Sequence, residues 1–288
     1  MRSTFHGSIV ALPTPFQDGA IDFRRFGQLI ERQIAAGSHG LVIAGTTGEA
    51  ATLDEGERQA LFEYAVGITR ARVPVIAGVG TNATRSSTRM ARRAEEAGVD
   101  GCLVVTPYYN KPTQAGLELH FRAVAEATRL PIVLYNVPAR TCVDLLPATT
   151  LALAELPNVV AIKEATTPAR VGELARSGAI DVLCGEDAWI ADGMHAGACG
   201  VVGVVANVVP RRVVELLAAL EREDEASAAH QVEELAPLVR ALFRETNPAP
   251  LKHALAVLEL CAEELRAPLV PVGPETASEV ERTLAALD

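Results

Sequence analysis

The sequence lacks several features on which whole classes of protein depend. It contains no run of lysine or arginine, and its 36 acidic residues outnumber its 26 basic ones, giving a formal net charge of −10. A phosphate backbone or an anionic membrane surface would repel such a chain. We therefore expect no nucleic acid partner.

Long hydrophobic runs are also missing. No apolar stretch reaches the roughly 18 residues that a membrane-spanning helix needs, and the first residues, M-R-S-T-F-H-G, lack the apolar region of a secretory signal. These absences predict no membrane association and a cytoplasmic location.

Cysteine and histidine are too few and too scattered to build a disulfide framework or a metal site. The five cysteines include no C-x-x-C pair and have mostly apolar neighbours, which favours buried free thiols. The six histidines form no H-E-x-x-H motif and no close cluster with cysteine or carboxylates. We expect no required metal, and metal analysis of the purified protein tests this.

Short apolar runs typical of buried strands are abundant, and 49% of the residues are hydrophobic, ample for a sizeable core. They occur at 8–12, 40–44, 73–78, 101–105, 131–135, 159–163, 180–184 and 200–204. Amphipathic segments separate them, such as the one after Asp22, a predicted N-cap, which ends before Gly37, a predicted C-cap. A similar signal ends the segment before Gly98.

Eight strand and helix units in about 200 residues predict an α/β fold, a closed (β/α)₈ TIM barrel. An open doubly wound sheet is the structural alternative. Its dinucleotide-binding form needs G-x-G-x-x-G after the first strand, where this chain has A-L-P-T-P-F-Q-D-G. Helical patterns alone follow residue 207, so we expect a catalytic barrel over 1–222 and a C-terminal helical extension over 223–288.

Polar residues follow four of the predicted strands. They are G-T-T-G-E at 45–49, T-P-Y-Y-N-K-P at 106–112, Y-N-V-P-A-R-T at 135–141, and Lys163 at the end of V-V-A-I-K. Because barrel enzymes carry their chemistry at the C-terminal ends of the strands, we expect these groups to meet at one rim.

Lys163 is the most informative of these residues. A lysine inside an apolar barrel loses hydration of its charged form, and the neutral amine attacks carbonyl carbon to form a Schiff base. The alternative is a strand-end lysine that pairs with Glu164 or reaches solvent. Because alternate residues face opposite sides of a strand, Glu164 points away from Lys163. Tyr135 ends the neighbouring strand, where its phenol would carry protons or simply pack in the core.

The neighbouring loops suggest the substrate class. The G-T-T-G turn offers backbone N–H groups and two hydroxyls for a small carboxylate. Arg140 would clamp a second carboxylate, although a solvated loop arginine is the ordinary reading. The acids in C-G-E-D at 184–187 disfavour a phosphate site, so we expect an unphosphorylated carbonyl acid.

Together these stretches resemble the dihydrodipicolinate synthase family of Schiff-base-forming enzymes. The resemblance rests on G-T-T-G-E-A-A-T-L, T-P-Y-Y-N-K-P-T-Q-A-G-L, Y-N-V-P-A-R-T and A-I-K-E-A-T in this order, and it spans essentially the whole chain. It implies condensation of pyruvate with aspartate semialdehyde, in the diaminopimelate route to lysine, without an organic cofactor.

The resemblance also implies a role for each matching residue. Lys163 would form the imine with pyruvate, and Tyr135, Thr46 and Tyr109 would relay protons, Tyr109 from a neighbouring subunit. A homodimer would thus complete each site, and the family's usual tetramer would pair two dimers. The family's substrate-binding positions are matched by Thr47 with Thr46 for the pyruvate carboxylate, Arg140 for the semialdehyde carboxylate, and Gly185 and Val202 for the pyruvate pocket.

One departure from the family concerns regulation. The chain resembles lysine-inhibited members at Asn82 and Tyr108, but it has Ser86 where they often carry glutamate, and Glu55 and Arg58 where they often carry histidine. We therefore predict weak or absent inhibition by lysine.

Two alternatives remain open. One is another pyruvate-imine lyase of the superfamily, such as an N-acetylneuraminate lyase or a keto-deoxy sugar acid aldolase or dehydratase. Thr47, the paired tyrosines and Arg140 favour the synthase. The other is a barrel that binds ligands without turnover, because a fold alone does not guarantee function.

Overall fold

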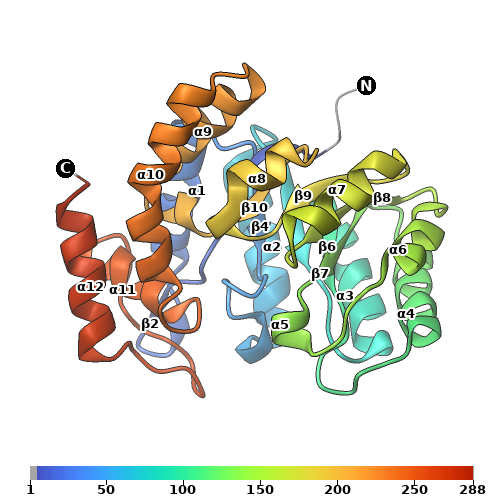
Figure 1. The fold of residues 1–288 in the computed structure, drawn as a ribbon. Helices are drawn as coiled ribbons and strands as arrows, with labels where there is room; N and C mark the ends of the chain where they lie inside the picture. Colours follow the sequence, from blue (N-terminus) through green and yellow to red (C-terminus); the bar gives the residue numbers. More distant parts are fainter. Residues whose placement is uncertain (1–4, 288) are drawn as a thin grey trace.

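The fold is a closed barrel of eight parallel strands surrounded by helices, seen in a computed structural model that describes residues 5–287 (Figure 1). Around the barrel the strands follow the order β1, β10, β9, β8, β7, β6, β5, β4. Their bounds are β1 Gly7–Ala11, β4 Gly40–Ile43, β5 Val75–Gly78, β6 Gly101–Val105, β7 Ile132–Asn136, β8 Val159–Glu164, β9 Asp181–Cys184 and β10 Gly200–Gly203. Each predicted apolar run forms one of these strands, and the predicted (β/α)₈ barrel is confirmed.

The barrel interior is filled by apolar side chains to which every strand contributes. They include Ile9, Val42, Ile76, Leu103, Val133, Ala161, Leu183 and Val202. Ile162, which follows Ala161 in β8, belongs instead to the core between the strands and the helices. Because side chains alternate between the two faces of a strand, Lys163 faces the interior, as its position in the sequence predicts.

Helices cover the outside of the barrel. Between and after the strands they are α1 Phe23–Ala36, α2 Glu55–Thr69, α3 Thr84–Glu96, α4 Gln114–Glu126, α6 Pro147–Ala154, α7 Pro168–Ser177, α8 Ile190–His195 and α9 Pro210–Glu221. The predicted ends of α1 are confirmed. The carboxylate of Asp22 accepts the backbone N–H of Arg25, and Gly37 ends the helix in the left-handed conformation, at φ 89°.

Several short elements at the C-terminal ends of the strands were not predicted. They are the two-stranded sheet of β2 Phe16–Gln17 and β3 Ala20–Ile21, the helix α5 Pro138–Thr141, and the 3₁₀ turns η1 Ala50–Thr52, η2 Asp187–Trp189 and η3 Val205–Asn207. Each is too short for hydrophobic periodicity to reveal it.

Three more helices follow the barrel and pack along one side of it (Figure 1). They are α10 Glu225–Leu242, α11 Ala249–Val257 and α12 Pro274–Ala285. Leu238, Leu251 and Val280 from these helices are buried in the same core as the barrel helices. The division into domains at 1–222 and 223–288 stays a proposal, and the break between α9 and α10 supports it.

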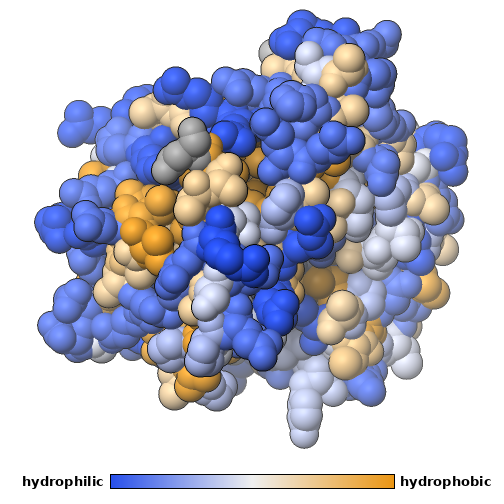
Figure 2. Space-filling model, turned by 60° about the vertical axis from the view of Figure 1, so that its left-hand side comes forward, coloured by the Kyte–Doolittle hydropathy of each residue, from blue (hydrophilic) through white to orange (hydrophobic). Residues whose placement is uncertain are grey.

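Hydrophilic residues predominate on the face drawn in Figure 2, where hydrophobic residues form small separate groups. None of the helices within residues 5–287 has the length and apolar content that crossing a bilayer requires. Across the same residues, no three His, Cys, Asp or Glu side chains gather closely enough to hold a metal ion.

Candidate active site

Lys163 lies inside the barrel at the C-terminal end of β8, only 6% exposed. It is paired in register with Tyr135 of the neighbouring strand β7. The Lys163 Nζ atom lies 4.3 Å from the centre of the Tyr135 ring. The amine therefore sits beside the phenol, in a setting with little water.

A small cavity of about 50 Å³ surrounds this pair. Six of the eight predicted site residues line it: Thr46, Thr47, Tyr135, Arg140, Lys163 and Gly185. A larger cavity of about 340 Å³ also touches Thr46, Tyr135 and Arg140, and extends to Tyr108 and Arg58. The predicted meeting of polar groups from several strands at one rim is thus present.

Thr46 and Thr47 lie on the tight turn between β4 and η1. Positive φ angles at Ala44 (51°) and Glu49 (56°) bend the chain at either side of them. Gly48 lies so close to the neighbouring backbone that an added Cβ would be 3.0 Å from the Cα of Ala44. The Thr14 hydroxyl donates to the Gly48 carbonyl at 2.7 Å. The glycine and these bends allow two hydroxyls to face the cavity.

A buried ion pair holds the same turn from behind. The Nζ atom of Lys252, in α11, lies 2.5 Å from Oε1 of Glu49, and neither side chain is exposed. Lys252 also donates to the Glu264 carbonyl at 2.7 Å and lies over the Phe16 ring. The backbone N–H of Arg266 donates to Oε2 of Glu49 at 3.0 Å. The C-terminal segment therefore fixes the turn that carries the threonines.

Gly185 and Glu186 follow β9, which neighbours β8 on the side opposite to β7 and Tyr135. A Cβ on Gly185 would lie 2.9 Å from the Glu164 carbonyl oxygen, so only glycine fits without displacement there. The carboxylate of Glu186 lines the small cavity. Burial raises the pKa of Glu186, and the positive charges of Lys163 and Arg140 oppose that shift.

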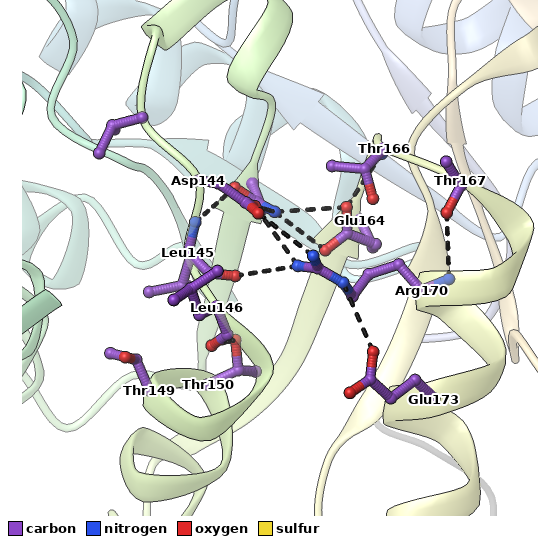
Figure 3. A network of polar contacts seen from close by, with 12 residues as sticks. Asp144, Leu145, Leu146, Thr149, Thr150, Glu164, Thr166, Thr167, Arg170 and Glu173 are labelled. Carbon is purple, nitrogen blue, oxygen red and sulfur yellow. Dashed lines mark hydrogen bonds and ion pairs between the residues drawn. The ribbon is translucent and has the colours of Figure 1, made fainter.

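A polar network on the outer face of the barrel fixes the strand ends that carry Lys163 and Tyr135 (Figure 3). The buried carboxylate of Glu164 accepts Nδ2 of Asn136 at 3.1 Å and the backbone N–H of Thr166 at 2.9 Å. The amide of Asn136 also donates to Asp144 at 2.7 Å, and Arg170 pairs with Asp144 at 3.2 Å. Burial raises the pKa of Glu164, whereas its hydrogen bonds and Arg170 act in the opposite direction.

Arg140 and Asn247 meet at the mouth of the cavity. Arg140 is exposed on the short helix α5, and its Nη2 donates to the Asn247 carbonyl at 3.3 Å. The side-chain amide of Asn247 donates to the Thr47 hydroxyl at 3.0 Å. Asn247 thus touches two of the predicted substrate-binding residues.

Two predicted site residues lie outside this cavity. Tyr109 is 88% exposed and has a positive φ of 73°, unusual for a bulky residue. Val202 is 1% exposed and belongs to the packed apolar interior of the barrel.

Sequence reasoning did not single out Asn247 or Glu186 as site residues. By itself, T-N-P-A-P at 246–250 predicts only a break between helices, and C-G-E-D predicts only a pair of acids that disfavours phosphate. No local pattern places Asn247 beside Thr47, because 200 residues separate them.

An amine, a phenol and two threonine hydroxyls at the C-terminal mouth of a closed (β/α)₈ barrel define a lyase-type enzyme that acts on carbonyl compounds. The model of the dihydrodipicolinate synthetase family matches residues 4–287. The chain belongs to this family, as the sequence motifs predict.

Individual relatives agree with this assignment. The 4-hydroxy-tetrahydrodipicolinate synthase of Pelobacter propionicus is 47% identical over 272 residues, which cover 93% of this chain and 94% of that protein. The crystal structure of dihydrodipicolinate synthase from Aquifex aeolicus matches with a TM-score of 0.96 and 42% identity, covering 98% of each chain. The enzyme from Cyanidioschyzon merolae, solved with lysine bound, matches with a TM-score of 0.94 and 32% identity over 99% of each chain.

Proposed function

We propose that this protein condenses pyruvate with L-aspartate 4-semialdehyde to form 4-hydroxy-tetrahydrodipicolinate, in the diaminopimelate route of lysine biosynthesis. The observation that carries the proposal is the buried amine of Lys163, 4.3 Å from the ring centre of Tyr135, in a cavity that two threonines also line. The names of the relatives support the choice of substrates.

The chemistry begins with Lys163. Its amine, after giving up a proton, attacks the C2 carbonyl of pyruvate, and loss of water gives an imine. Loss of a proton from the pyruvate methyl group converts the imine to an enamine. The enamine carbon then attacks the aldehyde, which forms the new C–C bond and leaves an alkoxide that takes up a proton. Finally the substrate amino group attacks C2 and cyclises, which releases Lys163.

Each of these steps moves a proton, and hydroxyl groups suit that task. The Lys163 amine lies over the Tyr135 ring, and Thr46 lines the same cavity. We assign both to the proton relay. A phenol and a threonine hydroxyl each donate and accept, so they pass protons without leaving a buried charge.

Tyr109 completes the relay in this proposal from a second copy of the chain. Its 88% exposure and its positive φ support this role, because a strained, exposed tyrosine on a loop suits a contact outside its own chain. A homodimer would then be the smallest active unit, and a tetramer would pair two dimers. We further propose a cytoplasmic location, which cell fractionation tests.

The remaining predicted residues bind substrate. Thr47 with Thr46 holds the pyruvate carboxylate, and Arg140 holds the carboxylate of the semialdehyde at the mouth through its planar fork. Gly185 lines the cavity beside Lys163 and would lie against the bound pyruvate. Val202 would shape the pocket only through its neighbours, since it does not line the cavity itself.

The deciding experiment combines a coupled turnover assay with borohydride trapping. The wild type should turn over pyruvate with aspartate semialdehyde, and borohydride with pyruvate should add a reduced pyruvate unit to Lys163, located by peptide mass. Lys163→Ala should lose both. No adduct in the wild type would contradict the proposal and favour a non-catalytic barrel.

A substrate panel separates the proposed activity from that of other pyruvate-imine lyases. All of these enzymes should give the borohydride adduct with pyruvate, so only the second substrate that is turned over distinguishes them. Turnover of N-acetylneuraminate or a keto-deoxy sugar acid above that of aspartate semialdehyde would contradict our assignment.

A further inference from the structure

Asn247 joins the two sides of the proposed substrate pocket, although it lies far from both in the sequence. It precedes α11, is 4% exposed, and lines both the small and the large cavity. Its side-chain Nδ2 donates to Thr47 Oγ1 at 3.0 Å, and its carbonyl accepts from Arg140 Nη2 at 3.3 Å. One residue therefore contacts both groups to which we assign substrate carboxylates.

We propose that Asn247 is a positioning residue for this reaction, which sets the direction of the Thr47 hydroxyl proton and so prepares the pyruvate carboxylate site. The inference rests on the proposed function. It assigns to the C-terminal extension a direct part in substrate binding.

The direction of the hydrogen bond between Asn247 and Thr47 decides where the Thr47 hydroxyl proton points. A threonine hydroxyl has one proton to give and accepts through its lone pairs. Because the Asn247 amide donates to Thr47 Oγ1, the lone pair on that side is occupied and the hydroxyl proton points elsewhere. Thr47 lines the cavity beside Lys163, so that proton is available to a substrate carboxylate, which needs donors.

The surrounding chain holds Asn247 in place for this task. Ala249 N–H donates to the Thr246 carbonyl at 3.1 Å, and α11 starts directly after Pro248. Further along α11, Lys252 is paired with Glu49, on the same turn as Thr47. The segment that carries Asn247 is thus tied to the threonine turn at two points, which fixes the distance between the amide and the hydroxyl.

Two substitutions separate positioning from folding. Asn247→Ala removes the amide donor, so the Thr47 hydroxyl is no longer directed at the pyruvate carboxylate. We expect the KM for pyruvate to rise about tenfold, the scale of the lost hydrogen bond between Thr47 and that charged group. Asn247→Asp should raise it further, because a carboxylate accepts the Thr47 proton and repels the pyruvate carboxylate. The KM for the semialdehyde should change less in both variants, because the backbone carbonyl that meets Arg140 remains.

Asn158→Asp provides a matched control at the opposite end of the barrel. The Asn158 amide donates to the carbonyls of Ala125 at 2.9 Å and Thr128 at 3.1 Å, just before β8 begins. This variant should lower the melting temperature while leaving the KM for pyruvate unchanged. Pyruvate should raise the melting temperature of the wild type and of the control more than that of Asn247→Asp, which gives a reading independent of turnover.

Several outcomes would overturn the inference while the proposed function stands. One is an unchanged KM for pyruvate in Asn247→Asp, and another is a larger rise of that KM in Asn247→Ala than in Asn247→Asp. A third is that the Asn247 variants raise the KM for pyruvate and the KM for the semialdehyde equally, and lower the melting temperature only as Asn158→Asp does. Loss of the borohydride adduct in the wild type would instead contradict the proposed function itself.

Discussion

Lys252 and Glu49 form an ion pair of 2.5 Å that is completely excluded from solvent and joins α11 to the turn that carries Thr46 and Thr47. Burial lowers the pKa of Lys252, and the charge of Glu49 opposes that shift. A buried pair of this kind contributes little net stability compared with apolar residues, but each partner is costly to leave alone. Its value here is the geometry that it fixes.

Removal of one partner should therefore be more harmful than removal of both. We expect Lys252→Met to lower the free energy of unfolding by about 3–5 kcal/mol, because Glu49 is left buried without a counter-charge. The double variant Glu49→Gln with Lys252→Met should recover part of that loss. Urea unfolding measures both.

The exposed pair between Arg72 and Glu31 supplies the control for this experiment. Its side chains are 41% and 52% exposed at a distance of 2.6 Å. Arg72→Met should cost less than about 1 kcal/mol, since water screens exposed pairs. Equal losses in Lys252→Met and Arg72→Met would contradict the role that we give to the buried pair.

Tyr135→Phe should slow catalysis and leave the fold intact. The ring would still pack beside Lys163, but the hydroxyl that we assign to proton transfer would be gone. We expect kcat to fall by about 10²–10⁴-fold, the usual contribution of a positioned acid or base. Steady-state kinetics and the rate of borohydride trapping measure the effect.

Tyr64→Phe, in α2, is the matched control for Tyr135→Phe, since that ring packs against Phe23 and Phe26 outside the barrel. A kcat for Tyr135→Phe equal to that of this control would remove Tyr135 from the relay.

The sequence predicts the barrel well because its signals are local. Each strand is a short apolar run between turn residues. Because alternate residues of a strand face the same side, Lys163 lies on the inner face if Ala161 does. The caps of α1 are likewise readable, because Asp22 and Gly37 act on backbone groups within a few residues.

The rest of the site depends on contacts that local patterns do not encode. The contact between Asn247 and Thr47, and the ion pair between Lys252 and Glu49, each bridge about 200 residues between a loop and the C-terminal extension. Val202 shows a different limit. Its strand was predicted, but Val202 does not line the cavity, although Val42 and Leu103 from the same interior cluster do.

Stability should fall in acid because of His120. This side chain is 3% exposed, with Nδ1 3.0 Å from the Thr84 hydroxyl, and burial lowers its pKa to about 4. The unfolded chain therefore binds more protons than the native chain between the ordinary pKa of 6.5 and about 4. The native state keeps its full stability above that range and loses about 3 kcal/mol as the pH falls through it.

Urea unfolding of the wild type and His120→Gln at neutral pH and near the lower end of this range isolates that contribution. Other groups titrate in both proteins, so the difference between the two is the informative quantity. The variant should lose less stability on acidification. An identical loss in both proteins would show that His120 does not titrate as its burial implies.

Inhibition by lysine should be weak because the residues at the predicted effector position offer no free carboxylate. The carboxylate of Glu55 is held by Arg89, which lowers the pKa of Glu55, and Arg93 lies 3.9 Å from it. Arg58 is buried and donates to the carbonyl of Gly78, and Ser86 carries no charge. The ammonium groups of lysine would meet cations here, so we expect no half-maximal inhibition at sub-millimolar lysine.

Ser86→Glu tests the physical reason for that expectation, because it supplies the carboxylate that lysine-inhibited members often carry. Inhibition should strengthen in this variant, whereas Ser86→Gln, of similar size and without charge, should behave like the wild type. The assay is turnover of pyruvate and aspartate semialdehyde against added lysine. Strong inhibition of the wild type would show that lysine binds without an acidic partner at position 86, and equal responses of the two variants would show that the missing charge is not the cause.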